Sequence, residues 1–166
     1  RSNVNVRGDV MMGNVPVVGA YVLAVPRDVP VQTGPQATSD VRGRFALSLP
    51  PGTRTYDVVV VPRGFYVTLG RTTVDTKKIL RAEVGQDGGS LTVDASADEH
   101  PRIRHAGAEF SVPLLVQRAG GTVESSAKRQ RLTIPNLEPG MYSVCGKAKC
   151  VSAYVPRFAT ASVSLQ

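Results

Sequence analysis

The chain has 166 residues, a formal net charge of +7 and a hydrophobic content of 42%. This length allows one ordinary domain or two small ones, and the hydrophobic content argues against an intrinsically disordered chain. No apolar run reaches the roughly 18 residues of a membrane-spanning helix, so the sequence predicts no membrane insertion.

Composition favours an all-β fold. Val greatly outnumbers Leu and Ile, and its branched Cβ suits the pleated surface of a strand. The 16 Gly and 12 Pro residues are spread along the chain and divide it into short segments. Short strands separated by turns at this spacing are typical of a β-sandwich.

Alternating apolar residues and turn signals predict thirteen strands along the chain. In the first half these are residues 5–11, 20–25, 36–39, 44–49, 56–61, 68–73 and 79–84. In the second half they are residues 90–95, 109–116, 130–134, 141–146, 150–155 and 159–165. Residues 76–84 also contain helix formers behind Asp75, which could cap a helix, but we favour a strand there.

One pattern occurs twice. Residues 44–60 and 131–146 each contain an alternating strand, a Pro-Gly pair and a Tyr that opens a second, valine-bearing strand. Pro51-Gly52 corresponds to Pro139-Gly140, and both pairs predict a type II turn. The repeat predicts two tandem antiparallel β-sandwich domains, residues 1–85 and 86–166. Their boundary is placed in the Gly- and Asp-rich residues 84–90.

The first half resembles the carboxypeptidase regulatory-like domain in residues 16–25, "PVVGAYVLAV", and 38–65, "TSDVRGRFALSLPPGTRTYDVVVVPRGF". The positions that match the family pattern are Pro16, Gly19, Ala20, Val22, Ser39, Asp40, Gly43, Phe45, Leu49, Pro51, Gly52, Tyr56 and Val58, while Arg54 and Thr55 lengthen the closing element. The resemblance implies an immunoglobulin-like or transthyretin-like antiparallel sandwich without catalytic residues of its own. Such modules are attached to metallocarboxypeptidases and to many bacterial exported proteins.

The second half is similar to this family only in its closing element, residues 132–145, "LTIPNLEPGMYSVC". The other two elements of the pattern are missing, so the resemblance implies a diverged second sandwich. The chain ends in "ASVSLQ", whereas transthyretin-like hydrolases end in Tyr-Arg-Gly-Ser. This difference argues against that enzymatic activity.

Cys145 and Cys150 are the two cysteines, and they flank a short polar loop between two predicted strands. A hairpin there could bring their Cα atoms within the roughly 4.4 to 6.8 Å that a disulfide needs. The alternative is a metal site, but two Cys without a nearby His form an incomplete zinc set. We therefore expect a disulfide, which favours an oxidising, extracytoplasmic location.

Other motifs have ordinary structural interpretations. His100 and His105, with Asp98, Glu99 and Glu109 nearby, could hold Zn²⁺, but Pro101 prevents a helix that would align them, and a solvated loop is expected. The tripeptide Arg7-Gly8-Asp9 matches a motif of integrin ligands but falls inside a predicted strand. Residues 40–43 predict a hairpin turn rather than a Ca²⁺ loop, because one carboxylate is too few.

The positive charge is scattered, with its densest cluster at residues 128–131, Lys-Arg-Gln-Arg. No aromatic residues interleave with this cluster, whereas proteins that bind RNA or single strands combine basic grooves with stacking aromatics. We expect a solvated basic surface and no nucleic-acid partner. Two Val-Pro-Arg segments, residues 61–65 and 155–158, could form an exposed aromatic and basic patch.

These observations predict a non-catalytic, extracytoplasmic pair of β-sandwich modules without a cofactor. Because the chain begins with Arg1 rather than Met, we expect it to belong to a larger exported protein. The expected role is that of a structural spacer between neighbouring domains, or of a module that binds a protein or a glycan. Two alternatives stay open: an accessory domain that positions substrate for a peptidase or glycosidase, and a polyanion- or carbohydrate-binding module. The sequence identifies neither the ligand nor the oligomeric state.

Overall fold

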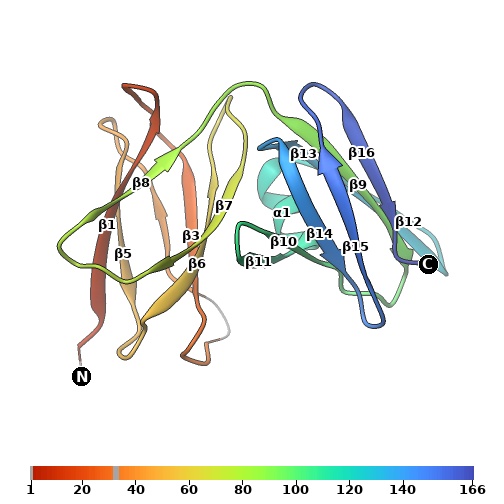
Figure 1. Cartoon of the computed structure of the whole chain (residues 1–166), viewed down its shortest axis with the longest axis horizontal. Coiled ribbons are helices and arrows are strands. Elements are labelled where there is room, and N and C mark those ends of the chain that lie inside the picture. Colours follow the sequence, from red (N-terminus) through yellow and green to blue (C-terminus); the bar gives the residue numbers. More distant parts are fainter. Residues whose placement is uncertain (1, 32–33) are drawn as a thin grey trace. The chain divides into compact units, whose positions relative to one another are not determined.

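The computed structural model describes residues 2–31 and 34–166. It divides into two compact units, the first comprising Arg1–Gly85 and Ala106–Ala108, the second Gln86–His105 and Glu109–Gln166. Within the described residues each unit is built from two four-stranded sheets (Figure 1). The all-β fold class with β-sandwich units is therefore confirmed.

The first unit contains strands β1 to β8. One sheet contains β2 (Val15–Pro16), β1 (Val4–Met12), β5 (Arg44–Leu49) and β8 (Ile79–Glu83), and β1 lies between β5 and β8. The other has the order β4 (Gln36–Thr38), β3 (Tyr21–Pro26), β6 (Thr55–Val61) and β7 (Thr68–Thr73), with every pair antiparallel.

Strand alternation creates the core of the first unit. Successive side chains of a strand point to opposite faces of its sheet. Val6 and Val10 of β1 therefore point into the space between the two sheets, and Val58 and Val60 of β6 point into it from the other sheet. The buried cluster that results contains Val6, Val10, Val17, Ala20, Val22, Ala24, Phe45, Leu47, Leu49, Tyr56, Val58, Val60 and Val84. All four consecutive valines of β6 are buried, and alternate ones, Val58 and Val60, belong to this cluster.

The second unit contains strands β9 to β16 and one helix. One sheet has the order β12 (Thr122–Ser125), β13 (Arg129–Leu137), β9 (Gly89–Ser96) and β16 (Thr160–Ser164). The other has the order β11 (Ala108–Ser111), β10 (Arg102–His105), β14 (Gly140–Cys145) and β15 (Cys150–Val155). Its fully buried large side chains include Leu91, Ile103, Phe110, Leu115, Leu132, Ile134, Leu137 and Tyr142.

The predicted strand at residues 109–116 is wrong in its second half. The strand β11 ends at Ser111, and helix α1 occupies Val112–Ala119. Ser111 caps the helix by accepting a hydrogen bond from the Leu114 N–H, and Gly120 ends it with a φ of 73°. Val112, Leu115 and Val116 are buried, because positions i, i+3 and i+4 lie on one face of a helix.

Three short strands, β2, β10 and β12, were not predicted. Strand β13 also continues beyond its predicted end, because its register with β9 shifts between Ile134 and Leu137. Asn136 lies in this irregularity with a φ of 54°, and Pro135 precedes it. A bulge accommodates a proline that a regular ladder would exclude.

The two Pro-Gly pairs differ in structure. Thr53 N–H donates to the Pro50 carbonyl at 3.3 Å, and Gly52 has a φ of 87°, as a type II turn requires. Gly140 instead has a φ of 149° and is the first residue of β14. The type II turn predicted at Pro139-Gly140 is therefore wrong. Here the corner is stabilised by Tyr142, whose hydroxyl donates to the Glu138 carbonyl at 2.6 Å.

In both units the first strand pairs with the last strand in parallel, side by side in Figure 1. The register of β1 with β8 runs from Arg7 opposite Ile79 to Met11 opposite Glu83. The register of β9 with β16 runs from Ser90 opposite Thr160 to Asp94 opposite Ser164. We call β1–β8 and β9–β16 the closing pairs. These pairs are parallel, whereas the predicted sandwiches are antiparallel. They form because the last strand of each unit returns to its first.

Gly8 sets the spacing of the first closing pair. A Cβ at this position would lie 2.2 Å from Phe45 Cζ and 2.7 Å from the Leu80 carbonyl oxygen. The Leu80 oxygen belongs to the backbone of β8, so a side chain would displace that strand. Gly8 is therefore a structural residue of the sheet.

We expect Gly8→Ala to lower the free energy of unfolding of the first unit by about 1–3 kcal/mol through overpacking. Urea denaturation followed by circular dichroism measures this change. Gly70→Ala is the control, because nothing lies within 4 Å of a Cβ at Gly70 in β7. Equal stability of the two variants would contradict the role of Gly8.

Candidate functional site

A cleft of about 610 Å³ opens in the first unit. Val6 and Leu80 line it from β1 and β8, and Tyr56 and Thr72 line it from β6 and β7. The connection between β7 and β8 contributes Val74, Asp75 and Lys78 to the lining. Since β7 and β8 are the outer strands of their sheets, the cleft lies between two sheet edges.

Among the described residues, four basic ones line the cleft beside one acidic residue, Asp75. Two of them direct their head groups to other partners. Arg71 Nε lies 2.9 Å from Asp57 Oδ1, and Arg81 Nη2 donates to the Gly13 carbonyl at 2.7 Å. The other two are Arg7 and Lys78.

Arg7 and Lys78 lie together where β8 begins. Arg7 is opposite Ile79 in the register, and Lys78 directly precedes Ile79 in the chain. Arg7 makes no ion pair with any carboxylate of residues 2–31 and 34–166. Lys78 Nζ is 4.0 Å from Asp75 Oδ2, with 83% of its side chain exposed, and such an exposed pair contributes little. Both cations are therefore accessible to an anionic ligand.

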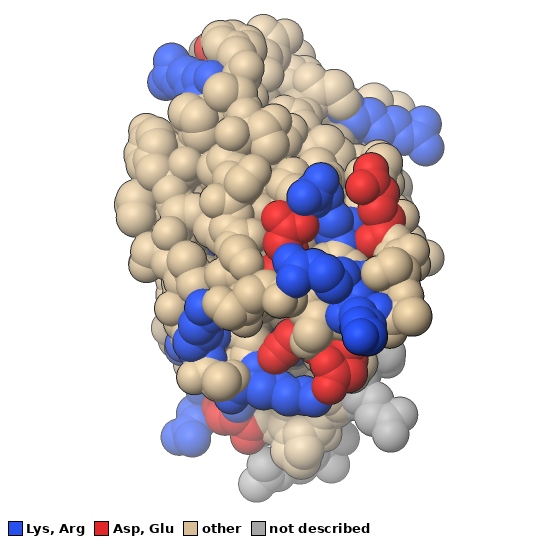
Figure 2. Space-filling view, turned by 90° about the vertical axis from the view of Figure 1, so that its right-hand side faces the viewer, with Lys and Arg blue, Asp and Glu red and all other residues tan. Residues whose placement is uncertain are grey.

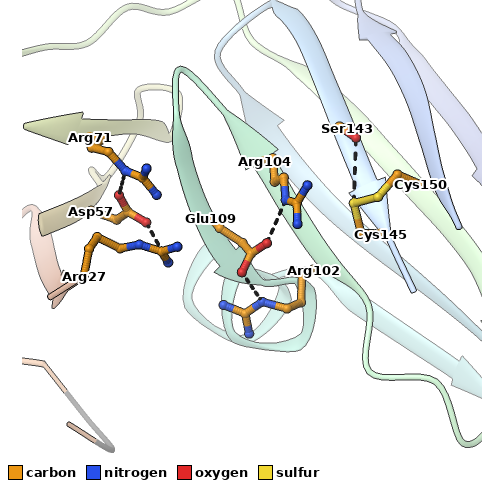
Figure 3. Close-up of polar contacts among 9 residues, drawn as sticks. All are labelled: Arg27, Asp57, Arg71, Arg102, Arg104, Glu109, Ser143, Cys145 and Cys150. Atoms are coloured by element: carbon orange, nitrogen blue, oxygen red, sulfur yellow. Dashed lines mark hydrogen bonds and ion pairs between the residues drawn. A yellow bond between two sulfur atoms is a disulfide. The ribbon is translucent and has the colours of Figure 1, made fainter. Parts of the chain in front are cut away.

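Asp57 of β6 is a fully buried carboxylate held by two arginines (Figure 3). Its Oδ2 lies 3.3 Å from Arg27 Nη1, and its Oδ1 accepts from Arg71 Nε. A buried charge is tolerated only when it is paired and hydrogen-bonded. The contact gives the guanidinium group of Arg71 a carboxylate partner within the first unit.

A second carboxylate, Glu109 of β11, joins two arginines of β10 (Figure 3). Its oxygens accept from Arg102 Nε at 2.8 Å and from Arg104 Nε at 2.7 Å. Partial burial acts to raise the pKa of Glu109, but the two arginines outweigh it and lower the pKa below its ordinary value. The carboxyl group therefore stays ionised and links neighbouring strands.

Cys145 and Cys150 form a disulfide at the end of the β14–β15 hairpin (Figure 3). They are directly opposite each other in the register, with Cα atoms 4.0 Å apart. Because neither sulfur carries a proton, Ser143 Oγ is the donor in its 3.8 Å contact with Cys145 Sγ. Glu99 fixes the tip of the hairpin by accepting from the Lys147 N–H at 2.7 Å.

His105 does not lie in the solvated loop that the sequence predicts. It belongs to β10, and its ring stacks on the Tyr142 ring with centroids 4.1 Å apart. Nδ1 donates to the Met141 carbonyl at 2.7 Å, and Nε2 lies 3.5 Å from Glu138 Oε1. The interaction with Glu138 raises the pKa of His105 above its ordinary value, although partial burial opposes it.

The His and acidic residues considered for a metal site do not come together. Asp98 contacts Ser96 and Lys147, Glu99 contacts Lys147, and Glu109 contacts the two arginines. Within the described part of the chain no group of three or more His, Cys, Asp or Glu residues is arranged to hold a metal ion. No helix in that part is long and apolar enough to cross a membrane.

Two other motif interpretations are confirmed. Arg7-Gly8-Asp9 lies inside β1, not on a loop. Asp40 turns its hairpin by accepting from the Arg42 and Arg44 N–H groups at 2.8 and 2.9 Å, which lower the pKa of Asp40. Gly43 supports this turn with a φ of 76°.

The basic cluster at residues 128–131 is interleaved with acids. Arg131 Nε lies 2.7 Å from Asp94 Oδ1, and Glu124 is opposite Arg131 in the register of β12 with β13. Figure 2 shows the same mixture on one face of the molecule, where Lys and Arg side chains alternate with Asp and Glu. The face has no uniform basic surface.

The two Val-Pro-Arg segments also differ. Phe65 is partly buried against the core of the first unit. Phe158 is 78% exposed and has a φ of 58° in the turn before β16.

The sequence did not single out Arg7 and Lys78 as site residues, because their proximity depends on the pairing of β1 with β8. The local signal that could have drawn attention to Lys78 is the Lys77-Lys78 pair in the connection between the predicted strands at 68–73 and 79–84.

No protein-family model and no curated protein sequence matches this chain. Among solved structures, it is similar to the Bacillus anthracis TIE protein, with 11% identity and a TM-score of 0.43 over 100% of this chain and 34% of that one. It thus spans about a third of that protein.

Two further solved structures are similar along nearly their whole length. GBS52, the minor pilin of Streptococcus agalactiae, has 11% identity and a TM-score of 0.34, over 98% of this chain and 94% of that one. A putative cell adhesion protein from Bacteroides ovatus has 9% identity and a TM-score of 0.33, over 99% of this chain and 92% of that one. TM-scores below 0.5 at such identities assign neither a function nor a partner to this chain.

We expect the isolated chain to gain the mass of two hydrogen atoms on reduction, measured by mass spectrometry. Cys145→Ser/Cys150→Ser should lower the free energy of unfolding of the second unit by at most about 2 kcal/mol, because the closed loop is short. The far-UV circular dichroism of this variant should be the same as that of the unmodified chain. An identical mass with and without reductant would show that the bond is absent.

We expect His105 to make the stability of the second unit depend on pH. Because its pKa is raised in the folded state, its contribution is present below the ordinary value of 6.5 and is lost as pH rises through the folded-state pKa. We expect His105→Gln to reduce this dependence in thermal unfolding between pH 6 and pH 9. The control is His100→Gln, which replaces an exposed residue. Unchanged pH dependence in His105→Gln would exclude this role.

Proposed function

We propose that this chain is a non-catalytic pair of extracytoplasmic β-sandwich modules that acts as a tension-resisting spacer in a larger exported protein. The first module is proposed to be a carboxypeptidase regulatory-like domain and the second a diverged sandwich. The proposal rests on one observation, the parallel closing pair of each unit.

A parallel closing pair places the entry and exit of a unit at opposite ends of the two strands. The chain enters the first unit at the start of β1 and leaves it at the end of β8, opposite Met11. Tension between entry and exit therefore pulls the two strands in opposite directions along their own axes. Their ladder hydrogen bonds run between the strands, so all of them are loaded together rather than broken one after another.

The second unit has the same arrangement in β9 and β16. The Leu165 N–H extends the pairing by donating to the Asp94 carbonyl at 2.9 Å, as the Val84 N–H does to the Met11 carbonyl in the first unit. The Cys145–Cys150 disulfide supports the extracytoplasmic part of the proposal, since such bonds persist in oxidising compartments.

We expect single-molecule stretching of the chain tethered by its two ends to give one unfolding event for each unit. Moving the first tether to Asn14→Cys, in the exposed turn between β1 and β2, applies the force at the exit end of β8. The strand β8 is then peeled from β1 one hydrogen bond at a time. The unfolding force of the first unit should fall, and that of the second unit should not change.

The second unit is an internal control, because its attachment is the same in both experiments. Untethered Asn14→Cys should match the unmodified chain in thermal stability, which separates a change of pulling direction from a change of stability. An unfolding force of the first unit that is independent of the tether position would refute the tension-resisting role.

A further inference from the structure

We infer that the cleft between β7 and β8 binds an extended acidic peptide, which adds to β8 as a further strand of the first sheet. The inference does not depend on the spacer function. It rests on the open edge of β8, on the cleft beside that edge, and on the position of Arg7 and Lys78.

The backbone of β8 presents hydrogen-bonding groups to the cleft. In a parallel ladder, alternate residues direct both N–H and C=O to the same neighbour. The Val84 N–H donates to the Met11 carbonyl, so Leu80 and Ala82 also face β1. Ile79 and Arg81 therefore direct their N–H and C=O groups to the free edge, where an extended peptide can pair.

The side chains at this edge favour an acidic peptide. Arg7 and Lys78 lie at the start of β8. The acidic residue of the cleft lining, Asp75, forms only a long contact of 4.0 Å with Lys78, and both side chains are exposed to solvent. A peptide carboxylate at this end of the cleft would meet two cations. Val74 and Leu80, which are only partly buried, provide apolar surface for peptide side chains that point into the cleft.

An extended peptide fits these groups better than a glycan does. Sugar rings commonly stack on exposed aromatic faces, but Tyr56, the aromatic residue among the described cleft-lining residues, is 2% exposed. The edge of β8, in contrast, offers the regular spacing of backbone groups that another strand matches. The cations then select acidic partners.

The test uses fluorescence anisotropy with labelled, end-blocked peptides of alternating Glu and Val. We expect the Glu-Val peptide to bind and a Lys-Val peptide of equal length not to bind. Arg7→Glu/Lys78→Glu should weaken binding of the Glu-Val peptide by about tenfold or more. The control Arg42→Glu/Arg63→Glu makes the same change of net charge at two exposed residues outside the cleft and should bind normally.

Backbone methylation tests strand addition without changing the protein. Two Glu-Val peptides carry N-methyl groups on the Glu residues only or on the Val residues only. Because alternate N–H groups of an added strand face β8, one of these peptides should lose binding and the other should keep it. Equal binding of the two would overturn strand addition. Failure of the Glu-Val peptide to bind would overturn the inference. It would also be overturned if a heparin oligosaccharide bound and the Glu-Val peptide did not, with the heparin binding lost in Arg7→Glu/Lys78→Glu.

Discussion

The return of the last strand to the first is the constraint on which each unit depends. In the first unit, β8 completes the sheet beside β1 and places Leu80 and Ala82 against the core. The absence of a side chain at Gly8 allows this approach. The same pairing leaves the outer edge of β8 open and brings Arg7 beside Lys78. One pairing thus fixes the path of tension through the unit, the close contact at Gly8 and the walls of the cleft.

Acidic side chains fix much of the irregular backbone. Asp40, Asp75 and Glu99 each accept at least one backbone N–H bond in a turn or at a hairpin tip. Asp57 and Glu109 each hold two arginines. The chain has 13 acidic and 20 basic residues. Because several of the acidic residues are engaged in these structural contacts, some cations have no close carboxylate in the described structure, and Arg7 is one of them. The accessible positive charge of the cleft follows from this distribution.

The strands with clear period-two patterns could be predicted from sequence, because the pleat determines which side chains are buried. Residues 44–49, 68–73 and 150–155 have the predicted bounds. Helix α1 was missed although Ser111, Pro113 and Gly120 signal it, because its valines also suit a strand. The environments of His105 and Arg7 could not be predicted, since both depend on pairing between distant segments. No local pattern contains that information.

The closing pairs also determine when each unit can fold during synthesis. Arg7 pairs opposite Ile79, and Ser90 pairs opposite Thr160, so the first strand of each unit waits for almost the whole unit to emerge. Such non-local contacts slow folding, and until the last strand arrives one side of the first strand lacks its partner. Each unit, however, contains both members of its own pair. Strands β1 to β8 of the first unit can therefore pair before the second unit has emerged, which limits the length of chain exposed to aggregation to about that of a single unit.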